Sequence, residues 1–232
     1  QTLQDRVNAD RPLKVTVSEG TTVNVTSGDA FNLESYAGIT FEDKTTGATI
    51  TGGRHGIVAI NSVSGGISIT TTGETTGTSG DGIFAQNYGT GALSITTTGT
   101  TTGTNGDGIY ADNDGTGTDL TINAATTTGG RYGIIAINDG TGALSITTSG
   151  ATTGEFYGIY ANNSSAGTGL TINAATTTGG AIDGIYADNN GTGALSITTT
   201  GTTTGGTGDD GIDAYNKSTG TDLTINAATT TG

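Results

Sequence analysis

The 232-residue sequence contains no cysteine, no methionine and no tryptophan, and it has a single proline. Without cysteine the chain has no disulfide, no thiolate metal ligand and no thiol nucleophile. Only 31% of its residues are hydrophobic and 5% are aromatic, which is low for an ordinary globular domain. No apolar run approaches the ~20 residues of a membrane-spanning helix, so we expect the chain not to be membrane-embedded.

Basic residues are also scarce, with 7 Lys and Arg against 21 Asp and Glu and a formal net charge of −14. Five of the seven lie in the first 54 positions, and only Arg131 and Lys217 follow. Such a surface repels phosphate backbones and anionic lipid headgroups, so we expect no nucleic-acid partner. Glycine-rich stretches such as 115–117 lack the Lys-Ser/Thr of a phosphate-binding loop, and we expect no cofactor.

Glycine, by contrast, occurs 43 times and belongs to a repeat. Gly-Ile recurs at spacings of 26, 26, 25, 25, 26 and 27 residues. The seven starts are Gly56, Gly82, Gly108, Gly133, Gly158, Gly184 and Gly211. Each unit continues with a Gly/Thr-rich turn, an L-x-I segment and a Thr-rich stretch. A unit of this length with three short extended segments matches one coil of a solenoid.

Period-2 alternation sets the facing of each segment. In the unit that starts at Gly108, Ile109 and Ala111 share one face with Asn113, whereas Tyr110 and Asp112 share the other. Segments this short, bounded by glycine, are strands rather than helices. We therefore predict an all-β fold, a right-handed parallel β-helix with three sides, about 26 residues per coil and eight to nine coils.

One asparagine position recurs in all seven units. Its members are Asn61, Asn87, Asn113, Asn138, Asn163, Asn189 and Asn216. A side-chain amide donates and accepts at once, so stacked amides can bond from coil to coil. We interpret this row as an architectural ladder rather than as a site.

The two ends of the chain differ from its repeats. Residues 1–29 hold the proline and read as an N-terminal cap with an irregular first coil. There we expect a short helix over 2–10 and strands at 15–17 and 23–25. Residues 30–232 form the repeats, which stop inside a unit, so we expect a piece of a longer protein.

Groups that could catalyse a reaction do not converge in this sequence, and we expect no enzyme activity. The single histidine, His55, has no nucleophile motif or second imidazole beside it and reads as a corner residue. Asp209 and Asp210 are the only adjacent aspartate pair, without a basic residue in register. Four aspartates share the corner position before Gly-Ile, where two stacked pairs are a conceivable weak calcium site and solvated turns are the simpler interpretation. They are Asp81, Asp107, Asp183 and Asp210.

The outward positions of the Gly-Ile segments carry large apolar side chains. The candidate binding residues on this stripe are Phe84, Tyr110, Ile135, Ile137, Tyr160, Tyr186 and Tyr215. An exposed apolar stripe of this length often marks an interaction surface, although stacking along a sheet also stabilises it.

The pattern GIYAxNxGTGALSITTTG, clearest at 82–103, 108–129 and 184–205, resembles the degenerate repeats of autotransporter passengers from Gram-negative bacteria. The resemblance covers residues 30–232. It implies a right-handed parallel β-helix that is exported across the outer membrane to the cell surface. Members of this family are commonly adhesins, self-associating factors or stalks for a separate effector.

Two functions follow as hypotheses. The first is a surface-exposed adhesin segment that binds host or bacterial surface molecules, protein or glycan, or a second copy of itself, through the stripe. The second is a passive spacer that presents a functional region located elsewhere in the parent protein. The threonine ranks also suggest an ice-binding face, but their outward spacing is irregular, and we expect no thermal hysteresis.

Overall fold

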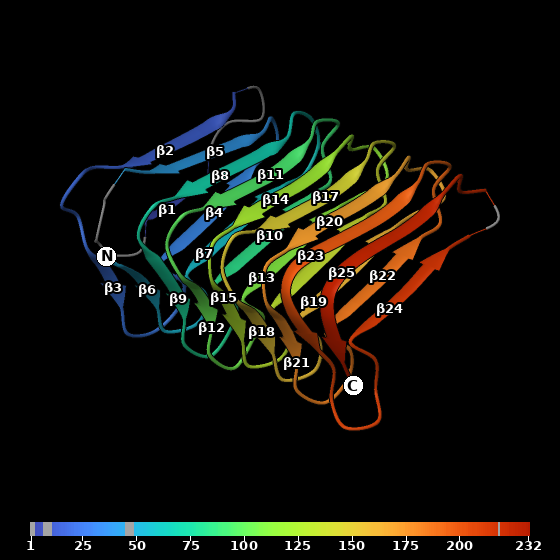
Figure 1. Ribbon diagram of the computed structural model, residues 1–232. Coiled ribbons are helices and arrows are strands. Elements are labelled where there is room, and N and C mark those ends of the chain that lie inside the picture. Colours follow the sequence, from blue (N-terminus) through green and yellow to red (C-terminus); the bar gives the residue numbers. More distant parts are fainter. Residues whose placement is uncertain (1–2, 7–10, 45–48, 218) are drawn as a thin grey trace.

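The computed structural model describes residues 3–6, 11–44, 49–217 and 219–232. These residues form 25 strands and no helix, and the strands wind into one solenoid (Figure 1). Every pairing between strands is parallel and joins one turn to the next, as between β10 (Ile83–Asn87) and β13 (Ile109–Asn113). The predicted fold is confirmed: a right-handed parallel β-solenoid of about eight turns with about 26 residues per turn.

Three faces make up each turn. Face 1 is a nine-stranded sheet that carries the Gly-Ile segments. Its strands are β1 (Leu3–Arg6), β4 (Phe31–Ser35), β7 (Ile57–Asn61), β10 (Ile83–Asn87), β13 (Ile109–Asn113), β16 (Ile134–Asn138), β19 (Ile159–Asn163), β22 (Ile185–Asn189) and β24 (Ile212–Asn216). Face 2 carries the L-x-I segments. Its strands are β2 (Leu13–Val17), β5 (Ile39–Asp43), β8 (Ile67–Thr71), β11 (Leu93–Thr97), β14 (Leu120–Ala124), β17 (Leu144–Thr148), β20 (Leu170–Ala174) and the first parts of β23 (Leu195–Thr204) and β25 (Leu223–Thr231).

Face 3 is built from the threonine-rich stretches. Its strands are β3 (Val23–Val25), β6 (Thr49–Gly52), β9 (Glu74–Gly77), β12 (Thr101–Gly103), β15 (Thr127–Gly129), β18 (Thr152–Gly154), β21 (Thr177–Gly179) and the last parts of β23 and β25. Faces 2 and 3 belong to one 16-stranded sheet because β23 and β25 run through the corner without a break. The register between these two strands shifts at that corner, between Thr199 and Thr202.

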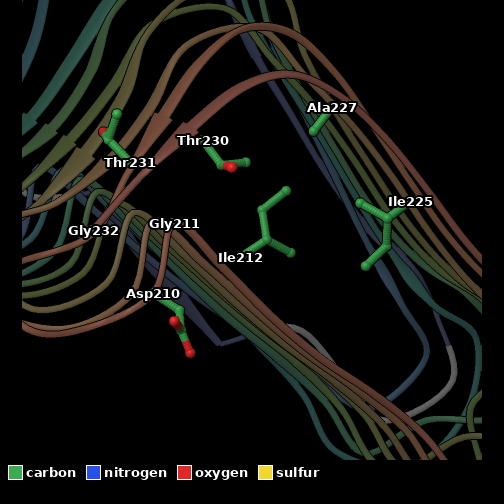
Figure 2. A pocket seen from close by; sticks show the side chains of 8 residues that line it. All are labelled: Asp210, Gly211, Ile212, Ile225, Ala227, Thr230, Thr231 and Gly232. Carbon is green, nitrogen blue, oxygen red and sulfur yellow. The ribbon is translucent and has the colours of Figure 1, made fainter.

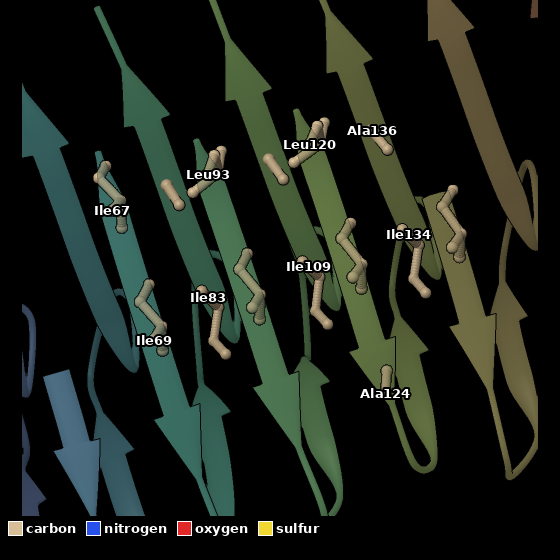
Figure 3. Close-up of a cluster of buried hydrophobic side chains, with 14 of the residues drawn as sticks. Ile67, Ile69, Ile83, Leu93, Ile109, Leu120, Ala124, Ile134 and Ala136 are labelled. Carbon is tan, nitrogen blue, oxygen red and sulfur yellow. The ribbon is translucent and has the colours of Figure 1, made fainter. Parts of the chain in front are cut away.

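The core consists of columns of apolar residues, as the alternation predicted. Ile83 pairs with Ile109, and Ala85 pairs with Ala111, each fully buried. Figure 3 shows isoleucine and leucine from faces 1 and 2 pointing at one another across the interior. From β7 to β24 the isoleucine and alanine columns of face 1 stack identical residues, whereas face 2 mixes isoleucine with leucine, as where Ile67 pairs with Leu93. Stacked apolar columns let a chain with little apolar content bury a continuous core.

Glycine before each isoleucine is required by a close approach of two faces. A Cβ added at Gly108 would lie 2.5 Å from the Cγ2 of Thr127 and 2.6 Å from the carbonyl oxygen of Gly133. Both distances are shorter than carbon tolerates, so only glycine lets face 3 fold back onto the start of face 1.

The asparagine ladder is confirmed. The Nδ2 of Asn87 donates to the Oδ1 of Asn113 at 2.8 Å, and the Nδ2 of Asn113 donates to the Oδ1 of Asn138 at 2.8 Å. The same bond links every neighbouring pair from Asn61 to Asn216. The Nδ2 of Asn113 also donates to the carbonyl oxygen of Thr118 at 3.2 Å, so the ladder holds the corner as well.

A second buried polar column, on face 3, has no such bonds. Its members are Thr75, Thr101, Thr127, Thr152, Thr177 and Thr203, all fully buried. Within the described part of the chain, none of these six Oγ1 atoms has a hydrogen-bond partner. Every second threonine of face 3 therefore points into the core, which the sequence pattern did not predict.

The helix expected over 2–10 is wrong where the structure can test it. Leu3–Arg6 forms strand β1, which pairs with Phe31–Ser35 in parallel. Residues 1, 2 and 7–10 lie outside the described residues. The strands expected at 15–17 and 23–25 are present as β2 and β3, so the first coil has all three faces. Pairing with the next coil, which local sequence does not encode, decides the structure of Leu3–Arg6.

Candidate functional site

The outer surface of face 1 carries the candidate stripe. Strand pairing brings its side chains into two neighbouring columns that run along the solenoid axis. In the first column Phe84 stacks on Tyr110, with ring centroids 4.9 Å apart and planes 8° apart. Further along the same column Tyr160 stacks on Tyr186 at 5.0 Å and 7°. Parallel strands in register place like residues one strand spacing apart, which suits ring stacking.

The stripe is not continuous, contrary to expectation. Ile135 stands between Tyr110 and Tyr160 in the first column and is only 9% exposed. Large rings on the coils above and below leave little of this shorter side chain accessible. Ile137 is half-buried in the second column. The exposed aromatic surface is therefore split into two parts.

The part nearer the C-terminus also includes corner residues that were not among the candidate binding residues. Tyr132 and Tyr157 occupy the corner before face 1, stack on each other at 5.5 Å and 5°, and meet Tyr160 edge to face at 6.4 and 5.6 Å. Tyr157 meets Tyr186 in the same way at 5.9 Å. We call the whole group the aromatic cluster. Its members are Tyr132, Phe156, Tyr157, Tyr160, Tyr186 and Tyr215.

The corner tyrosines were visible in the sequence as the residues that replace aspartate before Gly-Ile. Their link to the stripe was missed because a corner residue and a strand residue are not neighbours in a period-2 pattern. Only the turn geometry brings Tyr157 to within 5.6 Å of Tyr160. Tyr215 lies in the second column, opposite Asp188, and is 46% exposed.

Carboxylates surround the aromatic cluster. Burial and then the charge of Asp188 raise the pKa of Tyr160 and of Tyr186. Burial and then the charge of Asp183 raise the pKa of Tyr157. The hydroxyls of these three tyrosines therefore stay protonated over the physiological pH range.

Lysine and arginine also lie at this surface. The Cζ of Arg131 is 5.5 Å from the centroid of the Tyr132 ring, and the Nζ of Lys217 is 5.6 Å from that of Tyr215. Lys217 in addition approaches the Oδ1 of Asp188 at 3.6 Å. Both contacts have the geometry of cation–π pairs.

Three of the four corner aspartates, Asp81, Asp107 and Asp183, are buried, which corrects the simpler interpretation of the sequence, whereas Asp210 is exposed as that interpretation expects. The backbone N–H of Asp107 donates to the Oδ1 of Asp81 at 2.7 Å, and that of Tyr132 donates to the Oδ1 of Asp107 at 3.2 Å. Asp183 accepts from the N–H of Asp210 in the same way at 3.0 Å. The carboxylates of Asp81, Asp107 and Asp183 thus each satisfy a backbone donor of the next coil. Burial and the charge of Asp81 raise the pKa of Asp107 to about 6.

His55 belongs to this corner column. Its Nδ1 accepts the backbone N–H of Asp81 at 2.9 Å, and its ring lies 5.8 Å from that of Phe84. Below it, Asp29 accepts from Arg54 and from the backbone N–H of His55. The histidine therefore has a structural role as a backbone acceptor at the corner.

No group of three or more His, Cys, Asp or Glu side chains with metal-binding geometry occurs among the described residues. The same residues include no helix of the length and hydropathy that a membrane span requires. The buried corner aspartates accept backbone N–H groups of the next coil, and the calcium hypothesis gains no support from their geometry.

A pocket of about 360 Å³ lies at the last turn (Figure 2). Its lining residues are Asp210, Gly211, Ile212, Ile225, Ala227, Thr230, Thr231 and Gly232. Most of these side chains are the core positions of the final coil, seen from the end of the solenoid. The pocket holds one carboxylate and no converging polar groups, so we assign no site to it.

The candidate site is therefore an outer surface, not a cleft: six aromatic rings on successive coils, bordered by carboxylates. Among known protein families, curated proteins and solved structures, none matches this chain.

Proposed function

We propose that this chain is an interaction segment of a surface-exposed autotransporter passenger, exported across the outer membrane of a Gram-negative bacterium. In this proposal it acts as an adhesin or interaction scaffold and binds surface molecules of a host or of other bacteria through the outer side of face 1. The observation that carries it is the aromatic cluster, in which six rings form one patch on a surface otherwise dominated by small hydroxylated residues.

The outward position and the exposure of these rings support a functional interpretation. The large rings stand at outward positions, whereas the inward isoleucine and alanine columns fill the core. Tyr215 remains 46% exposed and Phe156 37% exposed. Contiguous exposed rings of this kind favour binding over simple packing.

The test is a bead assay with the purified chain. Beads coated with the chain are scored for attachment to cultured epithelial cells and for attachment to one another. In the test variant Phe84, Tyr110, Tyr160 and Tyr186 become threonine, which retains strand propensity. The matched control changes two exposed rings at the corner that follows face 1, Tyr36 and Tyr88, to threonine; neither belongs to the stripe or to the aromatic cluster.

We expect attachment to fall at least ~10-fold in the test variant and to persist in the control, because a few large rings usually carry most of the binding energy. Circular dichroism establishes that both variants keep the β-solenoid. A folded test variant that attaches as well as the unmodified chain would contradict the proposal.

The uninterrupted register favours a passive spacer as the second candidate. From β7 to β22 each strand of face 1 pairs residue by residue with the next, without a bulge. A rod of this regularity can hold another region at a distance without binding anything. In that case both variants and the unmodified chain attach equally weakly.

A further inference from the structure

The chain's own basic residues lie on the aromatic cluster and indicate which ligand groups the cluster binds. After residue 54 the sequence contains two basic residues, Arg131 and Lys217. Both lie over rings of the cluster, Arg131 over Tyr132 and Lys217 over Tyr215. These two rings belong to the first and the last coil of the cluster. A cation therefore stands at each end, and none lies between them in the sequence.

Between these ends four tyrosine rings stack in pairs and are partly exposed. Tyr160 and Tyr186 cover each other's faces at 5.0 Å, and Tyr132 and Tyr157 do the same at 5.5 Å. Their hydroxyls are the outermost atoms of outward-pointing side chains. A sugar ring needs a free aromatic face for stacking, whereas a guanidinium or ammonium group needs hydrogen-bond acceptors and negative charge.

The negative charge is supplied at the same place. Asp188 is 8% exposed, and its Oδ1 has no hydrogen-bond partner within the described residues. Its one ion pair, to the Nζ of Lys217, is long at 3.6 Å. Because this oxygen is buried, Asp188 acts on a ligand at the surface through its charge rather than through a direct bond to Oδ1. Asp183 and Asp213 add charge beside Tyr157 and Tyr215.

We propose that the aromatic cluster binds an arginine- or lysine-bearing polypeptide segment of a partner, whose cationic groups bond to the hydroxyls of Tyr157, Tyr160 and Tyr186 and are attracted by the charge of Asp188. This inference rests on the proposed function, since it specifies the partner chemistry of the same face. The net charge of −14 attracts such a segment over a longer range, and the cluster fixes where it binds.

The probe is a short peptide of alternating arginine and glycine, titrated calorimetrically at physiological ionic strength. Its partner probe replaces each arginine by citrulline, which has nearly the same shape and no charge. The test variant combines Tyr157→Phe, Tyr160→Phe and Tyr186→Phe. It removes three oxygens, keeps the ring stacks and leaves the net charge unchanged. The control is Tyr36→Phe with Tyr88→Phe.

We expect the arginine peptide to bind the unmodified chain and the control alike, and to bind the test variant ~10-fold more weakly, as the loss of hydrogen bonds to a charged group implies. Asp188→Asn weakens binding further while it retains the shape of the side chain. The citrulline peptide binds no variant measurably.

Three outcomes overturn the inference. Equal affinity of the arginine peptide for the test variant and the unmodified chain would reduce the binding to general charge attraction. Equal binding of the citrulline peptide would remove the requirement for a cation. Binding of a neutral oligosaccharide in place of the peptide would assign the cluster to glycans. In the last two cases the bead assay can still succeed, so the proposed function would stand without this inference.

Discussion

Two buried columns in this solenoid have the same construction and opposite bonding. On face 1, Asn113 and its counterparts stack in register, and each amide bonds to the next amide and to a corner carbonyl. On face 3, Thr127 and its counterparts also stack in register, fully buried, but no hydroxyl among the described residues of that column has a partner.

The difference follows from the length of the two side chains and from the number of polar atoms that each one carries. An amide places a donor and an acceptor on separate atoms, so it spans the gap between coils and bonds in both directions at 2.8 Å. A threonine hydroxyl is shorter, and its methyl group occupies the space beside Gly108. Stacking identical polar residues therefore stabilises a solenoid only when the side chain reaches its copy in the next coil.

The largest expected effect on stability comes from an interruption of the asparagine ladder. Asn113→Ala removes the oxygen that accepts from Asn87 and the N–H that donates to Asn138. It also leaves a cavity at a fully buried position. We expect a loss of about 2–4 kcal/mol in the free energy of unfolding, measured by urea denaturation followed by circular dichroism. Asn123→Ala, an exposed position on β14, serves as the control and costs little.

An Asn113→Ala variant as stable as the Asn123→Ala control would show that the ladder contributes no net stability. The two columns would then be energetically equivalent despite their different bonding.

The corner aspartates form a third column, which is hydrogen-bonded to the backbone but also brings like charges together. Asp107 is 3% exposed and accepts a backbone N–H, but it stands above the like charge of Asp81. Burial and this charge raise its pKa to about 6 from the ordinary value of 3.8. The stability that belongs to the protonated carboxyl is complete below pH ~3.8 and is lost as the pH rises through ~6.

Asp107→Asn keeps the acceptor for the N–H of Tyr132 and removes the charge. We therefore expect this variant to exceed the unmodified chain by about 1–2 kcal/mol at pH 7 and to match it at pH 4, after allowance for the water that reaches the corner. Urea denaturation at the two pH values measures this difference. Asp139→Asn makes the same change of net charge at an exposed position and should show no such gain. An equal gain in both variants would point to overall charge instead of the corner pair.

Features that recur in every repeat could be predicted from the sequence. Features that depend on pairing with another coil or on the geometry of a turn could not. The Gly-Ile period and its alternation predicted the coils, the inward Ile109 and Ala111 and the asparagine ladder, because each of these repeats in register. The strand at Leu3–Arg6 could not be predicted, since only pairing with the next coil makes it one. Neither could the contact of Tyr157 with Tyr160, which depends on the turn between them.

The inward threonines were missed for a related reason. In a stretch such as Thr126-Thr127-Thr128, successive residues are identical, so alternation gives no signal of which one faces the core. The structure places Thr127 inside and leaves Thr128 exposed. A period-2 pattern requires a contrast between the two faces, and face 3 offers none.

The smallest expected effect on stability concerns the threonine column of face 3. Thr127→Val replaces a buried hydroxyl without a partner by a methyl group of similar size, at a site where the neighbouring Gly108 already packs against the other branch of the side chain. We expect a gain of about 0.5–1 kcal/mol, because desolvation of the hydroxyl is no longer required. Thr128→Val makes the same change one residue later, where the hydroxyl faces water, and should leave stability nearly unchanged. If Thr127→Val instead destabilised the solenoid while Thr128→Val did not, the face 3 hydroxyls would have to be bonded in solution, and the two columns would work by the same principle.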